Sequence, residues 1–172
     1  WIDGKGAIRE YDMRQGKARR VTPEPISHAH GVQLAASPDG ERLAMFVPTG
    51  MGQGPAQLTV VRVADGKMTR VGEPVEYCDL GAMFASSFSV RLPFLWTDPE
   101  HVAFVRNQGM FVADGGTRGG TPRLMQANVV TGKVAEISDL RSLPFQSRLS
   151  LERLPTPRFV VRGINSELRY VI

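Results

Sequence analysis

The sequence predicts an all-β protein, a partial β-propeller of about three four-stranded antiparallel blades. Two short patterns carry this prediction: a hairpin turn that ends in Gly-Lys, and a Pro-Asp turn that precedes an apolar strand. The two patterns alternate along the chain at nearly constant spacing, as in repeat architectures. The chain also has 18 glycines and 12 prolines in 172 residues, which indicates many turns between short strands.

The hairpin pattern occurs three times, at residues 7–17, 58–67 and 124–133. Each copy ends in a glycine that precedes a lysine: Gly16, Gly66 and Gly132. Glycine suits a tight hairpin because such turns need a residue with positive φ. The β-branched and apolar residues on either side suit a pleated surface. We therefore expect a hairpin at each copy.

The second pattern is clearest at Ser37–Phe46, where Ser-Pro-Asp-Gly precedes Glu-Arg-Leu-Ala-Met-Phe. Thr97–Phe104 matches it in part, and Pro155–Val161 matches only in outline. Proline presets φ in a turn, and aspartate bonds the backbone just beyond itself. Each copy is therefore expected to reverse the chain before an extended run.

The spacing of the two patterns predicts the blades. The steps between successive turns are 25, 25, 34, 32 and 25 residues, measured at Gly16, Glu41, Gly66, Glu100, Gly132 and Pro157. A unit of roughly 50 residues holding four strands, A to D, is close to a propeller blade. The Pro-Asp turn then joins A to B, and the Gly-Lys turn joins C to D. The A strands are expected at 32–36, 93–97 and 149–154.

These units predict one domain over residues 1–172, with blade parts at about 1–22, 31–72, 90–139 and 147–172. The arrangement is half a blade, two full blades and another half. Natural proteins avoid exposing raw sheet edges. We therefore expect the sequence to be an excerpt of a longer chain, whose remaining blades would be its partners.

The two long steps indicate where a partner could bind. Their extra residues fall in Gly72–Val90, a D–A connection, and in Asn107–Pro122, a B–C connection. Successive connections of an antiparallel meander emerge at alternate ends, so both insertions are expected on one face. Loops on a rigid scaffold often carry function. The candidate contacts for a protein or peptide partner on this face are His28, His30, Tyr77, Asp79, Thr117 and Arg118.

The turn at Ser37–Phe46 resembles the β-propeller repeats of the TolB and WD40-like (PD40) family, in which Ser-Pro-Asp-Gly precedes Lys/Arg-x-Leu-Ala-Phe. Here Met45-Phe46 stands where the family has its aromatic residue. Asp-Pro-Glu replaces Pro-Asp-Gly in the second copy. The motif carries turn and core chemistry, so the resemblance implies a fold without a role.

Within that family the resemblance implies two functions. One is a non-catalytic scaffold for protein–protein interaction in the bacterial envelope, which favours a periplasmic or other extracytoplasmic location. The other is the substrate-gating propeller of a prolyl-oligopeptidase-like serine peptidase, whose α/β-hydrolase domain needs a G-x-S-x-G elbow. No such pentapeptide occurs in this sequence.

The sequence contains no pattern that predicts catalysis, a cofactor or a metal. His28 and His30 have no carboxylate or cysteine beside them to complete a ligand set, so we interpret them as solvated loop residues. His101 is expected on the surface of a strand. The single cysteine, Cys78, is interpreted as a small buried or loop thiol. Trp1 and Trp96 are expected to pack between blades.

The charge and hydropathy of the sequence bear on two classes of partner, nucleic acids and membranes. The net charge is +4, and six arginines against two glutamates after Leu140 account for the whole excess. These arginines mostly alternate with apolar residues and lack an aromatic stacking platform, so nucleic acid is not expected as a partner. No window is apolar over the roughly 18 residues that a membrane-spanning helix needs, so membrane insertion is not expected either.

Overall fold

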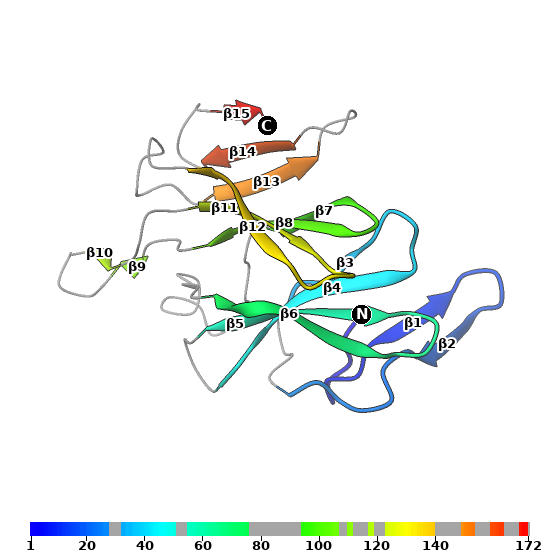
Figure 1. Ribbon diagram of the computed structural model, residues 1–172. Helices are drawn as coiled ribbons and strands as arrows, with labels where there is room; N and C mark the ends of the chain where they lie inside the picture. The colour runs from blue at the N-terminus through cyan, green and yellow to red at the C-terminus, as the bar shows by residue number, and fades with distance from the viewer. Residues whose placement is uncertain are drawn as a thin grey trace.

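The fold was analysed in a computed structural model that describes residues 1–27, 32–50, 55–75, 94–106, 110–111, 117–118, 123–139, 149–153, 159–163 and 169–171. Over these residues the regular structure is entirely β, in fifteen strands (Figure 1). The predicted all-β class is therefore confirmed. The strands form five antiparallel sheets, two of them with four strands each.

The two four-stranded sheets are complete blades, each a simple meander. The second blade has the order β3 (Ala35–Ala36), β4 (Arg42–Pro48), β5 (Ala56–Arg62) and β6 (Met68–Val75). The third blade has the order β7 (Phe94–Asp98), β8 (His101–Arg106), β11 (Arg123–Asn128) and β12 (Val134–Asp139). In both, the strands succeed one another as A, B, C and D, as the repeat predicts.

Smaller sheets flank these blades. The first blade is the hairpin of β1 (Arg9–Asp12) and β2 (Lys17–Arg20), which are a C and a D strand. The fourth comprises β13 (Leu149–Arg153), β14 (Phe159–Gly163) and β15 (Arg169–Val171), which are A, B and C strands. The pair β9 (Met110–Phe111) and β10 (Thr117–Arg118) belongs to no blade and lies in the connection from β8 to β11.

Of the three predicted A strands, those at 93–97 and 149–154 agree with β7 and β13 to within one residue at each end, and the first is shorter than predicted. The first A strand was expected over 32–36, but only Ala35 and Ala36 pair with β4. The D strand β6 continues to Val75, beyond the expected end of the blade at 72. Its pairing with β5 shifts register between Ala56 and Leu58, opposite Gly72, which has a φ of 64°. A bulge therefore lets this strand bend and continue.

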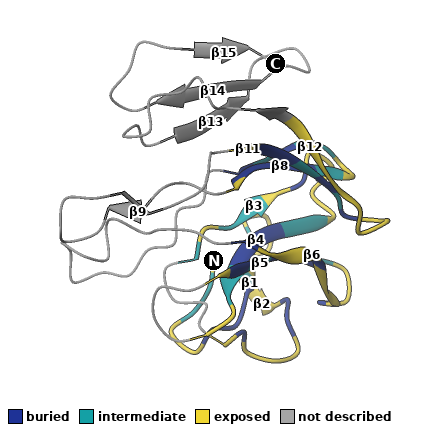
Figure 2. Ribbon diagram, turned by 60° about the vertical axis from the view of Figure 1, so that its left-hand side comes forward, coloured by how far each residue is buried: buried dark blue, intermediate teal, exposed yellow. Residues whose placement is uncertain are grey.

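The central strands of the second blade, β4 and β5, are buried on both faces. On one face, Ala44 and Phe46 of β4 belong to an apolar cluster with Trp96, Phe104 and other residues of the third blade. On the other face, Met45 of β4 packs in a second cluster with residues of the first blade. The sheet therefore lies between two neighbours, and much of β4 and β5 is coloured as buried in Figure 2. Such a series of stacked sheets is the arrangement of propeller blades, whereas a two-sheet sandwich would leave one face of each sheet in water.

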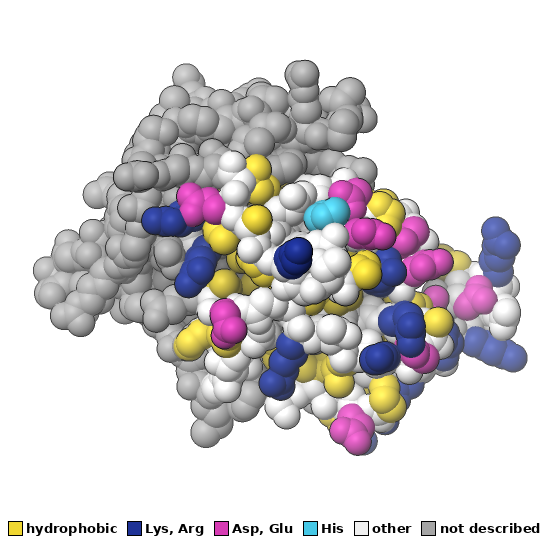
Figure 3. Space-filling model, in the orientation of Figure 1, with side chains coloured by type: hydrophobic (Ala, Val, Ile, Leu, Met, Phe, Trp, Pro, Cys, Tyr) yellow, Lys and Arg dark blue, Asp and Glu magenta, His cyan; other side chains and the backbone are white. Residues whose placement is uncertain are grey.

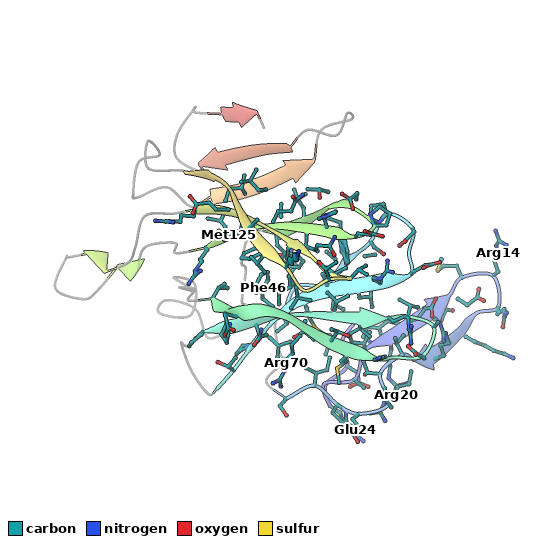
Figure 4. The ribbon with its side chains drawn as sticks, in the orientation of Figure 1. Arg14, Arg20, Glu24, Phe46, Arg70 and Met125 are labelled. Atoms are coloured by element: carbon teal, nitrogen blue, oxygen red, sulfur yellow. The ribbon has the colours of Figure 1, made fainter. Side chains whose placement is uncertain are left out.

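Adjacent residues of β4 thus pack against different blades. Phe46 and Met125, labelled in Figure 4, point into the space between the second and third blades. Val61 on β5 is fully buried and belongs to the opposite cluster, whereas Leu58 and Val60 face the third blade. Because a strand alternates its side chains, each blade has one set of apolar residues for each neighbour.

The two tryptophans have different environments. Trp96 is 4% exposed and packs between the second and third blades, as predicted. Trp1 is 53% exposed, so the expectation that it packs between blades is wrong. Its backbone instead pairs with the first residue of β1: the amino terminus donates to the carbonyl of Arg9, and the amide of Arg9 donates to the carbonyl of Trp1. The backbone pairing holds the residue without burying its ring.

Candidate functional site

The turns and the pair β9–β10 that the structure describes lie at two opposite ends of the blades. The A–B and C–D turns lie at the right of Figure 1, and β9 and β10 lie at the left. We call the end with the A–B and C–D turns the turn face, and the end with the B–C and D–A connections the loop face. Thr117 and Arg118 form β10, where Thr117 pairs with Phe111 and Arg118 with Met110. The predicted contacts His28, His30, Tyr77 and Asp79 lie outside the described residues, so the grouping of the six contacts stays a prediction.

The turn face has the same backbone contact in both complete blades. The Val63 amide donates to the Glu41 carbonyl at 2.9 Å, and the Val129 amide donates to the Glu100 carbonyl at 2.8 Å. Each bond joins the A–B turn to the end of the C strand. The two turns of one blade are therefore joined by a backbone hydrogen bond.

Both A–B turns are held by a hydroxyl and a carboxylate. The Ser37 hydroxyl accepts from the Arg42 amide at 2.9 Å, and the Thr97 hydroxyl donates to the His101 carbonyl at 3.2 Å. Both hydroxyls thus bond the backbone of the first residue of the B strand, in turns of which the second is one residue shorter. The Ser37 hydroxyl and then the Glu41 amide bind the Asp39 carboxylate and lower its pKa.

The turn face of the third blade contains a side-chain network of Asp98, His101 and Asn128. His101 Nδ1 lies 3.0 Å from both carboxylate oxygens of Asp98, and His101 Nε2 lies 3.0 Å from Asn128 Nδ2. His101 and Asn128 are direct cross-strand partners on β8 and β11. Burial by itself raises the pKa of Asp98, but the bonds from the Glu100 amide and from His101 outweigh it and lower the pKa.

Sequence reasoning placed His101 on a strand surface but missed this network. His101 begins β8 and is partly exposed, as expected. A signal for its partner was nevertheless present. Asn128 stands four residues before the turn glycine, at the position of Asp12 in the first hairpin, and both side chains accept bonds from turn amides. A polar cap recurs there because the amides beyond the strand need acceptors.

Close approaches at the turn face join neighbouring blades. Arg42 Nη1 donates to the Pro99 carbonyl at 3.2 Å, which ties β4 to the A–B turn of the third blade. Gly66 lies so close to the first blade that a Cβ there would be 2.1 Å from the Val21 carbonyl oxygen. Only glycine fits this approach, and its φ of 70° also favours glycine.

On the face shown in Figure 3, acidic and basic side chains are interspersed with one another and with hydrophobic side chains. Several form exposed pairs, such as Arg19 with Glu10 at 2.6 Å and Arg123 with Glu136 at 2.7 Å. The described residues contain no cluster of three or more histidine, cysteine or acidic side chains that could hold a metal ion. They also contain no helix long and apolar enough to cross a membrane.

Comparison with known proteins finds a likeness of fold among solved structures. The sequence matches no protein-family model and no curated protein. Among solved structures, the fold is similar to that of TolB from Acinetobacter baumannii, with a TM-score of 0.48 and 14% sequence identity. The likeness covers 96% of this chain and 37% of that chain, so this chain spans well under half the length of that TolB.

Proposed function

We propose that this chain is a non-catalytic β-propeller scaffold that binds a protein or peptide partner on its loop face. The observation that supports the proposal most is the pair β9–β10, an added two-stranded element that leaves the third blade between β8 and β11. It extends one connection on one face, whereas the turns of the opposite face are short and tightly bonded. Elaborated loops on a rigid support are the usual place for recognition.

The blades supply that support. The central strands of the second blade are buried on both faces, and the Trp96 indole also donates across the seam to the Ala35 carbonyl. A partner on the loop face would therefore meet connections whose bases are fixed by the strands. Such preorganisation lowers the entropic cost of association. The resemblance of Ser37–Phe46 to envelope propellers favours an extracytoplasmic compartment for this interaction.

Site-specific photo-cross-linking tests the proposal. A photoreactive amino acid is placed at Thr117 in β10 or at Tyr77, a contact predicted from the sequence, and, as a matched control, at Thr131 in the C–D turn of the turn face. We expect a discrete protein adduct from Thr117 and Tyr77 and none from Thr131. Replacing residues 109–119 with a short Gly-Ser turn should abolish the adduct from Tyr77 while the circular dichroism spectrum is retained.

Two outcomes would count against the scaffold. Adducts formed only from Thr131 would place recognition on the turn face. Substrate peptides cross-linked to the protein, together with a G-x-S-x-G hydrolase domain in the same polypeptide, would favour the substrate-gating role in a serine peptidase.

A further inference from the structure

His101 lies between two groups whose hydrogen-bonding roles are set by other parts of the turn face. Asn128 Oδ1 accepts from the Val130 amide at 3.0 Å and from the Thr131 amide at 2.8 Å. These two amides can only donate, so the oxygen of the Asn128 side chain must face them. The amide nitrogen Nδ2 then faces His101 Nε2, at 3.0 Å.

This orientation determines where the imidazole proton lies. A primary amide nitrogen donates and cannot accept, so His101 Nε2 must be the unprotonated acceptor. The proton is then on Nδ1, which donates to the Asp98 carboxylate at 3.0 Å. The neutral Nδ1–H form is thus the one form of the ring that satisfies all three side chains.

A second proton would break this arrangement at a defined contact. It would sit on Nε2 and point at the Asn128 Nδ2 group, placing two donors against each other. The other ring nitrogen would keep its bond to Asp98, and the new positive charge would strengthen it. Protonation therefore strengthens the contact with Asp98 and forces the Asn128 side chain away from the ring. The Asn128 oxygen cannot move without breaking its hydrogen bonds from the Val130 and Thr131 amides. The C–D turn then loses these two bonds.

We propose that Asp98, His101 and Asn128 form a proton-sensitive lock that joins the A–B and C–D turns of the third blade and opens when His101 is protonated. The second blade has no such lock, because Arg42 and Arg62 occupy the positions of His101 and Asn128. The other charged residues of the elements that meet here are Glu100 in the same turn, Lys133 in the C–D turn, and Arg42 with Asp39 from the second blade. None of these supplies an acceptor to His101 Nε2 among the described contacts.

Nitrogen NMR of the full chain tests the starting state. In two-bond proton–nitrogen spectra of uniformly labelled protein at about pH 8, where free histidine is neutral, we expect the Nδ1–H form for one of the three histidines. The variant His101→Gln should remove that signal and so assign it. A histidine at this position in the Nε2–H form would overturn the proposal.

Amide hydrogen exchange tests the opening. Between about pH 8 and about pH 5.5, the protection of the Val130 and Thr131 amides should fall by about 3- to 10-fold, the value of one neutral hydrogen bond. The Arg14 and Gln15 amides, which Asp12 caps without a histidine, are the internal control and should keep their protection.

Asn128→Asp is the matched variant. A carboxylate can still accept from the turn amides, as Asp12 does, and it can also accept from protonated Nε2. Its Val130 and Thr131 amides should therefore keep or gain protection as the pH falls. An equal loss of protection in Asn128→Asp and the unmodified chain, or no loss in the unmodified chain, would refute the lock.

Discussion

The indole Nε1 of Trp96 donates to the carbonyl of Ala35 at 2.9 Å, across the seam between the second and third blades. Ala35 is one of only two residues in β3, the shortest strand of its blade. The bond therefore fastens a short A strand to the neighbouring sheet. Blade stacking here depends on a directed contact as well as on apolar burial.

Trp96→Phe should destabilise the chain by about 1–3 kcal/mol, because it removes a buried donor and leaves the Ala35 carbonyl without it. Urea unfolding followed by circular dichroism measures the change. Trp1→Phe is the matched control and should stay within about 0.5 kcal/mol, because that ring is exposed. Equal effects of the two substitutions would show that the hydrogen bond across the seam contributes nothing.

Gly66 and Gly132 allow a test of blade contact at constant backbone conformation. Both occupy the same turn position, with φ of 70° and 75°, but a Cβ at Gly132 would meet nothing within 4 Å. Gly132→Ala should cost about 1–2 kcal/mol for the left-handed conformation alone. Gly66→Ala should cost at least about 1–3 kcal/mol more, because its methyl group would collide with the Val21 carbonyl.

Thermal unfolding of the two alanine variants gives the comparison. The difference between them isolates the contact between the first and second blades. Indistinguishable melting temperatures for Gly66→Ala and Gly132→Ala would mean that the hairpin β1–β2 does not pack on the second blade as described.

Phe46 is the aromatic centre of the interface between the second and third blades. Its ring meets Phe94 at a centroid distance of 5.5 Å and Phe104 at 5.2 Å, both edge to face. Phe46→Ala should cost about 3–5 kcal/mol. A double-mutant cycle of Phe46→Leu with Phe104→Leu should give a coupling energy of about 0.5–1.5 kcal/mol in chemical denaturation. Additive effects would mean that the two rings do not interact.

Asp3 should make the first blade sensitive to acid. Its carboxylate accepts from Arg9 Nε at 2.7 Å and from the Ala7 and Lys5 amides, and these bonds lower its pKa to about 2. A carboxylate whose pKa is lower in the folded than in the unfolded state stabilises the fold at pH values above the ordinary aspartate pKa. This stabilisation is lost as the pH falls through the folded-state pKa. Asp3→Asn should therefore be less stable than the unmodified chain at neutral pH, with the difference shrinking between about pH 4 and about pH 2.

Urea midpoints measured at several pH values test this prediction, with Asp12→Asn as the control at another turn carboxylate. A difference between Asp3→Asn and the unmodified chain that persists unchanged below about pH 2 would show that the charge of Asp3 is not the cause.

The sequence determined the turns, and through them the strand order. Gly16, Gly66 and Gly132 all have positive φ, and Ser37–Glu41 and Thr97–Glu100 reverse the chain where their residues predict. Turn chemistry is local, since a few adjacent residues decide whether the backbone can reverse. Regular alternation of two such turns therefore produces a series of antiparallel meanders.

Only the tertiary structure decided which neighbour each residue meets. Leu43 to Val47 are all at least partly buried, so no alternation of apolar and polar residues reveals that Met45 faces the first blade and Phe46 the third. The same holds for Trp96 against Trp1, and for His101 with Asn128, 27 residues away. These relationships depend on the register and stacking of separate sheets. Register and stacking result from packing over the whole chain, so no short segment of sequence predicts them.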